Sequence, residues 1–222
     1  MSNPVDSSPD VAAGDAPNNP PRRPIYRTLK RALDVTASGV GLVLLSPIFL
    51  AAAIAVRFDS RGPVFYVQQR VGRNFVPFGI IKFRTMVSDA DRQGSQITAS
   101  SDARITRAGR ILRKTKIDEL PQLINILRGE MSLVGPRPEV PKYVEMFRED
   151  YAYILSVRPG VTDPASIKYR DESAHFVGDD HEREYAERIL PDKIALARHY
   201  VANATILGDL GLILKTLLRI AR

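Results

Sequence analysis

The chain has 222 residues, of which 44% are hydrophobic and 26% charged, and its formal net charge at pH 7 is +7; this length suits one ordinary domain with an appendage. The positive charge indicates an anionic partner, which can be a nucleic acid, acidic lipid headgroups or a phosphorylated substrate. The lack of cysteine excludes disulfides, a thiolate nucleophile and a cysteine-bound zinc ion, and the three histidines lack metal-ligand spacing, so chemistry falls to carboxylates, hydroxyls, lysine and arginine.

Residues 1–24 contain six prolines together with Ser, Asn, Asp and Gly. Such a segment has too little apolar mass to offset the entropy of ordering, so we predict a disordered tail. It does not have the pattern of a signal peptide, because no apolar core follows a basic start within it.

An uncharged stretch of 22 residues follows, from Val35 to Val56. As one helix it would be roughly 33 Å long, which is enough to span a bilayer and longer than most core helices. Ser46-Pro47 lies near its middle, where a proline removes a backbone hydrogen bond and bends a helix. We therefore predict a membrane segment with a bend at this pair.

Basic residues flank the uncharged stretch on both sides. They are Arg22, Arg23, Arg27, Lys30 and Arg31 before it and Arg57, Arg61, Arg70 and Arg73 after it. Because basic flanks tend to stay in the cytoplasm, this pattern suits a re-entrant helix that returns through the same face, with the Ser46 side chain satisfying the carbonyl that the proline frees. Hydropathy alone supports a plain kinked span equally well.

The remainder of the chain predicts a globular domain with short strands and several helices. We expect strands at 64–70 and 78–84, a helix start and a polar loop at 86–101, and helices from Thr106, over Glu119–Leu127, over Lys142–Leu155, and at 182–188 and 192–220. A rigid loop (SLVGPRPEVP) precedes Lys142, and the stretch SVRPGVTDPASIKYRDE predicts a loop with a short strand. The fold class is α+β, mostly helical with a few short strands.

The segment 104–139 contains the densest group of candidate functional residues. Six cations lie within thirteen residues: Arg104, Arg107, Arg110, Arg113, Lys114 and Lys116. Several recur at helical spacing, so they share a face that suits phosphate oxygens, which arginine binds bidentately. The alternative is a solvated basic face that touches lipid headgroups, and a charge run alone favours this alternative.

Asp118 and Glu119 directly follow the basic run. Adjacent carboxylates raise each other's pKa, whereas nearby cations lower it. An aspartate at this position could attack phosphorus or bind Mg²⁺. The alternative is a helix N-cap, since Asp favours the cap and Glu the first turn, and spacing alone favours the cap.

Four further basic residues are candidates for phosphate binding. Arg137 lies between two prolines that restrict its backbone. Lys82 and Arg84 are two apart on a predicted strand and so share a face, and Arg158 lies in a tight turn. Together with the carboxylate pair and the membrane segment, they indicate a phosphate-bearing substrate that is bound at the bilayer.

From about Ile25 to its C-terminus the chain resembles the bacterial sugar transferases, also called monotopic phosphoglycosyl transferases. The resemblance rests on KRALDVTASGVGLVLLSPIFLAAAIAVRFDSRGPVFYVQQRVGRN, FGIIKFRTM, RITRAGRILRKTKIDELPQLINILRGEMSLVGPRPE and VRPGVT. It implies transfer of a sugar-1-phosphate from a UDP-sugar to polyprenyl (undecaprenyl) phosphate with release of UMP, which initiates surface polysaccharide or glycoconjugate synthesis. It also implies a re-entrant membrane hairpin at 25–60, broken at Ser46 and Pro47, and a compact catalytic domain at 61–222 facing the cytoplasm at the bacterial inner membrane.

The same resemblance implies roles for individual residues. Asp118 would be the nucleophile, forming a covalent phosphosugar-aspartate, and would bind Mg²⁺, the expected cofactor; Glu119 would assist as metal contact or base. The residues implied to bind phosphates are Lys82, Arg113, Arg137 and Arg158. Inner-membrane lipids are expected partners and nucleic acid is not, while a homodimer remains open.

One stretch departs from the family's commonest form. After VRPGVT, where many members have an aromatic pair, this chain has Asp163–Arg170 (DPASIKYR), and it has no tryptophan. We interpret this as a subfamily difference near the nucleotide-sugar pocket, which leaves the identity of the sugar open.

Two rival classes remain. The first is a non-catalytic membrane scaffold that recruits glycan-assembly proteins through its basic face, and the presence of both Asp118 and Glu119 argues against it. The second is a nucleic-acid-binding protein, and both the uncharged run and the lack of a recognisable nucleic-acid module argue against that.

Overall fold

The computed structural model describes residues 23–88, 90, 102–170, 176 and 180–220. In chain order its elements are α1 (Pro24–Leu44), α2 (Ser46–Asp59), β1 (Phe65–Val71), η1 (Arg73–Phe75), β2 (Pro77–Phe83), α3 (Arg107–Thr115), η3 (Ile117–Glu119), α4 (Gln122–Arg128), β3 (Ser132–Val134), α5 (Pro141–Met146), α6 (Arg148–Ile154), β4 (Gly160–Thr162), α7 (Pro164–Lys168), α8 (His181–Glu184), η5 (Tyr185–Ile189), α9 (Leu190–Asn203) and α10 (Ile206–Ile220).

This mostly helical arrangement with a few short strands confirms the predicted α+β class. The predicted disordered tail lies outside the described residues, apart from its last two, and Pro24 already belongs to α1. Most of the polar loop expected at 86–101 also lies outside them.

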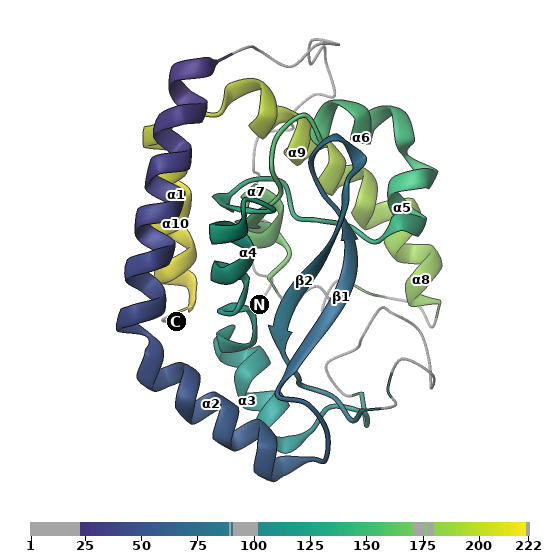
Figure 1. The fold of residues 1–222 in the computed structure, drawn as a ribbon. Coiled ribbons are helices and arrows are strands. Elements are labelled where there is room, and N and C mark those ends of the chain that lie inside the picture. Colours follow the sequence, from purple (N-terminus) through teal and green to yellow (C-terminus); the bar gives the residue numbers. More distant parts are fainter. Residues whose placement is uncertain (1–22, 89, 91–101, 171–175, 177–179, 221–222) are drawn as a thin grey trace, which may run out of the picture.

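The uncharged stretch is divided between α1 and α2, whose axes differ by 63° (Figure 1). Pro47 has no N–H to donate to the carbonyl of Val43, four residues earlier. The Ser46 hydroxyl donates to that carbonyl instead, at 2.8 Å, as predicted for this pair. Among the described residues, no single helix has both the length and the apolar composition to cross a membrane, although the bent pair α1–α2 has them together.

Helix α1 faces the protein with its polar side. Asp34 is 3% exposed, and its Oδ1 accepts a hydrogen bond from the N–H of Leu133 at 3.0 Å. Arg31 donates to the carbonyls of Ile126 and Leu127 at the end of α4. This orientation is the reverse of a soluble amphipathic helix, because the apolar side chains of α1 remain on the outside.

A buried carboxylate joins the first and last described helices, which lie side by side in Figure 1. Asp209 of α10 is 6% exposed. Its Oδ2 accepts hydrogen bonds from Lys30 Nζ at 2.6 Å and from the Tyr26 hydroxyl at 2.9 Å, and its Oδ1 accepts one from the Tyr200 hydroxyl at 2.8 Å. With both oxygens satisfied, this buried charge fixes α10 against α1.

Strands β1 and β2 form an antiparallel hairpin whose register runs from Phe65 opposite Phe83 to Val71 opposite Pro77. Both predicted strands are confirmed within one residue. Asn125 ties this hairpin to α4: its amide oxygen accepts from Ile81 N–H at 3.0 Å and its amide nitrogen donates to the carbonyl of Gly79 at 2.8 Å.

Helix α3 begins as predicted, because the Thr106 hydroxyl accepts a hydrogen bond from Gly109 N–H at 3.0 Å. A Cβ at Gly109 would lie 2.0 Å from the carbonyl oxygen of Thr85, so only glycine allows α3 to approach the end of β2 this closely. The helix expected over Glu119–Leu127 starts later, at Gln122, because residues 117–119 form a separate 3₁₀ turn.

Strands β3 and β4 pair in parallel, with Ser132 opposite Gly160 and Val134 opposite Thr162. Their backbones meet at two glycines. A Cβ on Gly160 would lie 2.1 Å from the backbone nitrogen of Gly135. The GPRP and VRPG loops, separated in sequence, are therefore in direct contact.

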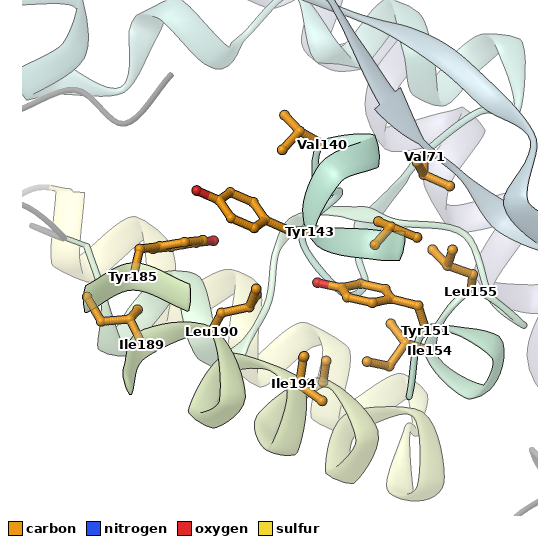
Figure 2. Close-up of a cluster of buried hydrophobic side chains, with 12 residues drawn as sticks. Val71, Val140, Tyr143, Tyr151, Ile154, Leu155, Tyr185, Ile189, Leu190 and Ile194 are labelled. Atoms are coloured by element: carbon orange, nitrogen blue, oxygen red, sulfur yellow. The ribbon is translucent and has the colours of Figure 1, made fainter. Parts of the chain in front are cut away.

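A hydrophobic cluster is formed mainly by α5, α6, η5 and α9, together with Val71 at the end of β1 (Figure 2). Tyr143 and Tyr185 meet there with their ring centroids 4.9 Å apart. The single helix expected over Lys142–Leu155 is divided at Phe147 into α5 and α6, and the one expected at 192–220 is divided into α9 and α10.

Replacing Asp209 by Ala should lower the free energy of unfolding by about 3–5 kcal/mol, because the enclosed Lys30 charge would lose its partner. Denaturant unfolding of detergent-held protein measures the change. Glu145→Ala, which removes the exposed pair with Arg148, is the matched control and should cost less than about 1 kcal/mol. Equal losses in the two variants would contradict the proposed role of Asp209.

Candidate functional site

Asp118 lies in the tight turn η3, which follows α3 at Lys116, a residue with a left-handed φ of 58°. The Asp118 side chain caps neither neighbouring helix. It is 8% exposed, and its Oδ1 is buried with no hydrogen-bond partner among the described residues. The N-cap interpretation of this aspartate is therefore wrong, and a buried carboxylate oxygen is left without a structural partner.

Glu119 has a different environment. Arg137 donates to both its oxygens, with Nη2 to Oε1 at 2.7 Å and Nη1 to Oε2 at 3.3 Å. Burial alone would raise the pKa of Glu119, but the attraction of Arg137 and Lys82, together with the hydrogen bonds from Arg137, outweighs burial and holds that pKa well below its usual value. Glu119 is therefore an ionised carboxylate whose charge is balanced by Arg137, and it is a weak base.

Burial raises the pKa of Asp118 to about 6, and the neighbouring Glu119 charge adds to the rise. Lys82, Lys116 and Arg113 act in the opposite direction without cancelling it. At neutral pH such a carboxylate is still mostly ionised, yet it is more basic than an ordinary aspartate. Two adjacent carboxylates whose environments move their pKa values apart are suited to different chemical roles.

Lys82 and Arg113 supply positive charge beside this pair. Burial lowers the pKa of Lys82 to about 8, and the attraction of Glu119 limits the fall. Burial also lowers the pKa of Arg113, against the attraction of Asp118. Its Nε donates to the Thr85 hydroxyl at 2.9 Å, which directs the guanidinium from α3 toward β2.

The Arg137 loop is held in place by Asp163, a residue that sequence analysis noted only as a departure from the family pattern. Asp163 is 1% exposed; its Oδ2 accepts from the Arg137 N–H at 3.1 Å, and its Oδ1 accepts from Ser166 N–H at 2.6 Å as the N-cap of α7. The Asp-Pro pair with Ser three residues on is a recognisable capping signal, but the contact with Arg137 is long-range and has no sequence signal.

A cavity of about 660 Å³ lies next to this site. One wall is cationic and comes from α3 and the turn after it, with Arg110, Arg113, Lys114 and Lys116. These residues therefore face a cavity, and the alternative of a purely solvated basic face does not hold for them. Glu119 and Arg137 also line the cavity, whereas Asp118, next to Glu119 in the chain, is not part of the lining.

Two predicted phosphate ligands do not lie at this site. The Arg84 guanidinium donates to the carbonyls of Ser60 and Arg61 at 2.8 and 2.6 Å, where it caps the end of α2. Arg158 donates from Nε to the carbonyl of Gly129 at 2.8 Å and lines a separate small cavity beside α1. Both side chains bind the carbonyls that helix ends leave unsatisfied, so their placement does not fit phosphate binding at Asp118.

Among the described residues, no group of three or more acidic or histidine side chains could enclose a metal ion. Mg²⁺ does not require such an enclosure, because it is commonly bound through one or two carboxylates together with substrate phosphates and water. The unpartnered Oδ1 of Asp118 is a ligand atom of this kind.

The sequence profile of the bacterial sugar transferases matches residues 25–222. The chain belongs to this family of transferase enzymes. The match begins at the second residue of α1 and includes every candidate residue described above.

Curated relatives have consistent names. The chain is 37% identical over 210 residues to the exopolysaccharide production protein ExoY of Sinorhizobium fredii, covering 88% of this chain and 86% of the relative. It is 36% identical over 203 residues to a UDP-glucose:undecaprenyl-phosphate glucose-1-phosphate transferase of Caulobacter vibrioides, covering 90% and 72%.

A shorter alignment relates the chain to a larger protein. It is 42% identical over 147 residues to a UDP-N-acetylgalactosamine-undecaprenyl-phosphate N-acetylgalactosaminephosphotransferase of Aeromonas hydrophila, covering 65% of this chain. The alignment spans about a third of that relative, 35% of its length.

Replacing Asp163 by Ala should lower the free energy of unfolding by about 2–3 kcal/mol, because two backbone N–H groups lose their acceptor in a buried place. Thermal and denaturant unfolding measure the effect. Asp180→Ala is a matched control, since Asp180 also caps a helix, α8, but at an exposed place, and it should cost about 1 kcal/mol or less. If Asp163→Ala lowers the free energy of unfolding no more than Asp180→Ala does, the hydrogen bond from Arg137 to Asp163 does not stabilise the fold.

Proposed function

We propose that this enzyme transfers a sugar-1-phosphate from a UDP-sugar to undecaprenyl phosphate and releases UMP, and that it thereby initiates a surface polysaccharide or glycoconjugate. The observation that carries the proposal is the buried Asp118 carboxylate, which has an unpartnered oxygen amid the charges of Lys82, Arg113 and Lys116. The names of the relatives from Caulobacter and Aeromonas support both the donor and the acceptor class.

In the first step, an Asp118 oxygen attacks the β-phosphorus of the UDP-sugar. The bond between that phosphorus and the bridging oxygen breaks, and UMP departs with the bridging oxygen. A phosphosugar-aspartate remains. The raised pKa of Asp118 suits a nucleophile, because basicity strengthens attack while the group remains ionised at neutral pH.

In the second step, an oxygen of undecaprenyl phosphate attacks the same phosphorus. The bond to Asp118 breaks and restores the carboxylate, while the sugar leaves as the lipid-linked diphosphate. Dividing the transfer in this way means that the nucleotide and the bulky lipid need not occupy the site together.

Arg137 and Arg113 have the clearest phosphate-binding roles in this scheme. In the described structure Arg137 donates to both oxygens of Glu119, so a phosphate bound by Arg137 would share the guanidinium with Glu119 or displace it. Lys82 and Arg113 lie close enough to Asp118 to influence its pKa and would stabilise charge on the transferred phosphoryl group.

The residues at this site fit a magnesium ion. Asp118 would bind it through its unpartnered oxygen, and when bound it would neutralise part of the charge on the diphosphate. Glu119, whose two oxygens are held by Arg137, is the less available carboxylate.

The outer apolar side chains support a membrane location for α1, α2 and α10. The exposed large hydrophobic residues on these helices are Ile25, Leu29, Leu33, Val35, Val40, Val43, Leu44, Ile48, Leu50, Ile54, Phe58, Leu207, Leu210, Leu214, Leu217 and Leu218. We place the 25–60 segment in the inner membrane as a re-entrant hairpin, with residues 61–222 as the catalytic domain on the cytoplasmic face.

Replacing Asp118 by Asn should reduce UMP release at least about 1,000-fold, because an amide cannot form the phosphosugar ester. The assay supplies a panel of UDP-sugars, Mg²⁺ and undecaprenyl phosphate to the full chain in nanodiscs. We expect UMP from one donor only, with turnover that requires the lipid.

Glu145→Gln removes an exposed carboxylate on α5 and should leave the rate unchanged within about twofold. A non-catalytic membrane scaffold is the alternative function, and it predicts no UMP from any donor with native, folded protein. Full activity in Asp118→Asn would leave the transferase class intact and exclude Asp118 as the nucleophile.

Single cysteines introduced at Thr28 and at Arg61 should both be labelled from the cytoplasmic side, because the bend at Ser46-Pro47 returns the chain to the face it entered. Membrane-impermeant thiol reagents on intact cells and on inverted vesicles measure this, and the chain has no native cysteine to interfere. Labelling from opposite sides would establish a span. Pro47→Ala is the companion variant and should shift Arg61→Cys labelling toward the outer face.

A further inference from the structure

The cavity beside Asp118 has two walls of different chemistry. The cationic wall from α3 has been described above. A second wall is aliphatic and comes from α4, β3, β4 and α10: Leu123, Leu133, Val161, Ile213 and Leu217. A ligand that contacts both walls must have a charged end and a hydrocarbon end.

The aliphatic wall starts beside the carboxylate pair. Leu120 and Leu123 line the cavity and follow Glu119 within four residues of the chain. A substituent that extends from a phosphate at the cationic wall past Glu119 would contact these leucines. Sugar hydroxyls or a uracil ring would lose hydrogen bonds to water there without replacing them, whereas a hydrocarbon chain would gain by leaving water.

Helix α10 connects this wall with the outside of the protein. Leu217 lines the cavity and is nevertheless 59% exposed, so it lies at the rim. Its neighbours Leu214 and Leu218 are 58% and 57% exposed and lie outside the cavity lining. The Thr216 hydroxyl is 2.6 Å from that of Thr162 on β4, which fixes the rotation of α10 about its axis.

We propose that the aliphatic wall formed by Leu123, Leu133, Val161, Ile213 and Leu217 binds the first isoprenoid units of the lipid acceptor, whose chain leaves past the rim of α10 into the bilayer. This assignment rests on the proposed function. The phosphate of the acceptor meets the cationic wall next to Asp118, while the rest of the chain stays in hydrocarbon. The donor then occupies the part of the cavity lined by α7 and α9, where Ser166, Tyr169 and Lys193 add polar and aromatic groups to an otherwise aliphatic lining.

The test compares two leucines on one helix. Leu217→Glu places a charge at the rim of the proposed acceptor site, whereas Leu214→Glu places the same charge at equal exposure outside the cavity. Any loss of membrane attachment should be similar in the two. A single-turnover assay with excess enzyme and no lipid measures UMP from the first step, and steady-state assays measure KM for undecaprenyl phosphate and for a soluble two-isoprenoid phosphate.

We expect Leu217→Glu to keep its single-turnover UMP within about twofold and to raise KM about tenfold for both acceptors, since both contain the first isoprenoid units. Leu214→Glu should change neither measurement by more than about twofold. If Leu217→Glu fails to fold, Leu217→Ala replaces it, with an expected rise in KM of about threefold.

Three results would overturn this assignment and leave the proposed function intact. They are equal effects of the two glutamate substitutions, a KM change confined to undecaprenyl phosphate, and loss of single-turnover UMP in Leu217→Glu. The second would mean that the rim leucine only seats the protein on the membrane, and the third that the wall binds the donor. Absence of UMP from the native protein is a separate outcome, and it would overturn the proposed function together with the assignment.

Discussion

The polar side of α1 holds the protein together. Asp34 bonds to β3, Arg31 closes the end of α4, and Lys30 pairs with Asp209 on α10. Together with β4, these three elements form the aliphatic wall of the cavity. Because charged and hydrogen-bonding groups make the inward contacts of α1, its apolar residues are left on the outside, so the same attachment holds the elements of the wall and leaves an outer hydrophobic surface.

Two adjacent carboxylates acquire different properties from their surroundings. Glu119 is paired with the guanidinium of Arg137, whose backbone N–H is held by Asp163, so the Glu119 carboxylate is ionised and its charge is balanced. Asp118, one residue earlier in a tight turn, receives no such partner for Oδ1. The difference depends on the turn after α3, in which Glu119 lines the cavity and Asp118 does not, and on the parallel pairing of β3 and β4, which brings the Arg137 loop to Asp163 at the start of α7.

Local features were predictable from the sequence. β-Branched and aromatic residues between Gly and Pro breaks located β1 and β2 within one residue, and Thr106 marked the start of α3. The breaks near Phe147 and Thr205 were missed because the apolar pattern continues through both positions.

The destinations of long side chains were harder to predict. Arg84 lies two residues after Lys82, and Arg158 lies five residues before Asp163, but each donates to carbonyls at a helix end that only the tertiary fold brings near. The role of Asp163, in contrast, was missed. Its capping pattern is local, whereas its contact with Arg137 joins residues 26 positions apart. Residue type and spacing therefore named the carboxylate pair and the neighbouring cations as candidates, although spacing alone favoured a helix cap and a solvated basic face, and they did not predict how these side chains are anchored.

The bond between Lys30 and Asp209 also has a consequence for biosynthesis. Among the described elements α1 leaves the ribosome first and α10 last, so the acceptor for Lys30 is missing during most of translation. Until α10 has been made, Leu123 and Leu133 lack the α10 residues that line the cavity with them, and Lys30 of α1 lacks the buried Asp209 carboxylate. The nascent chain therefore depends on other factors, such as the translation machinery and the bilayer, to shield these surfaces before the two ends of the fold can meet.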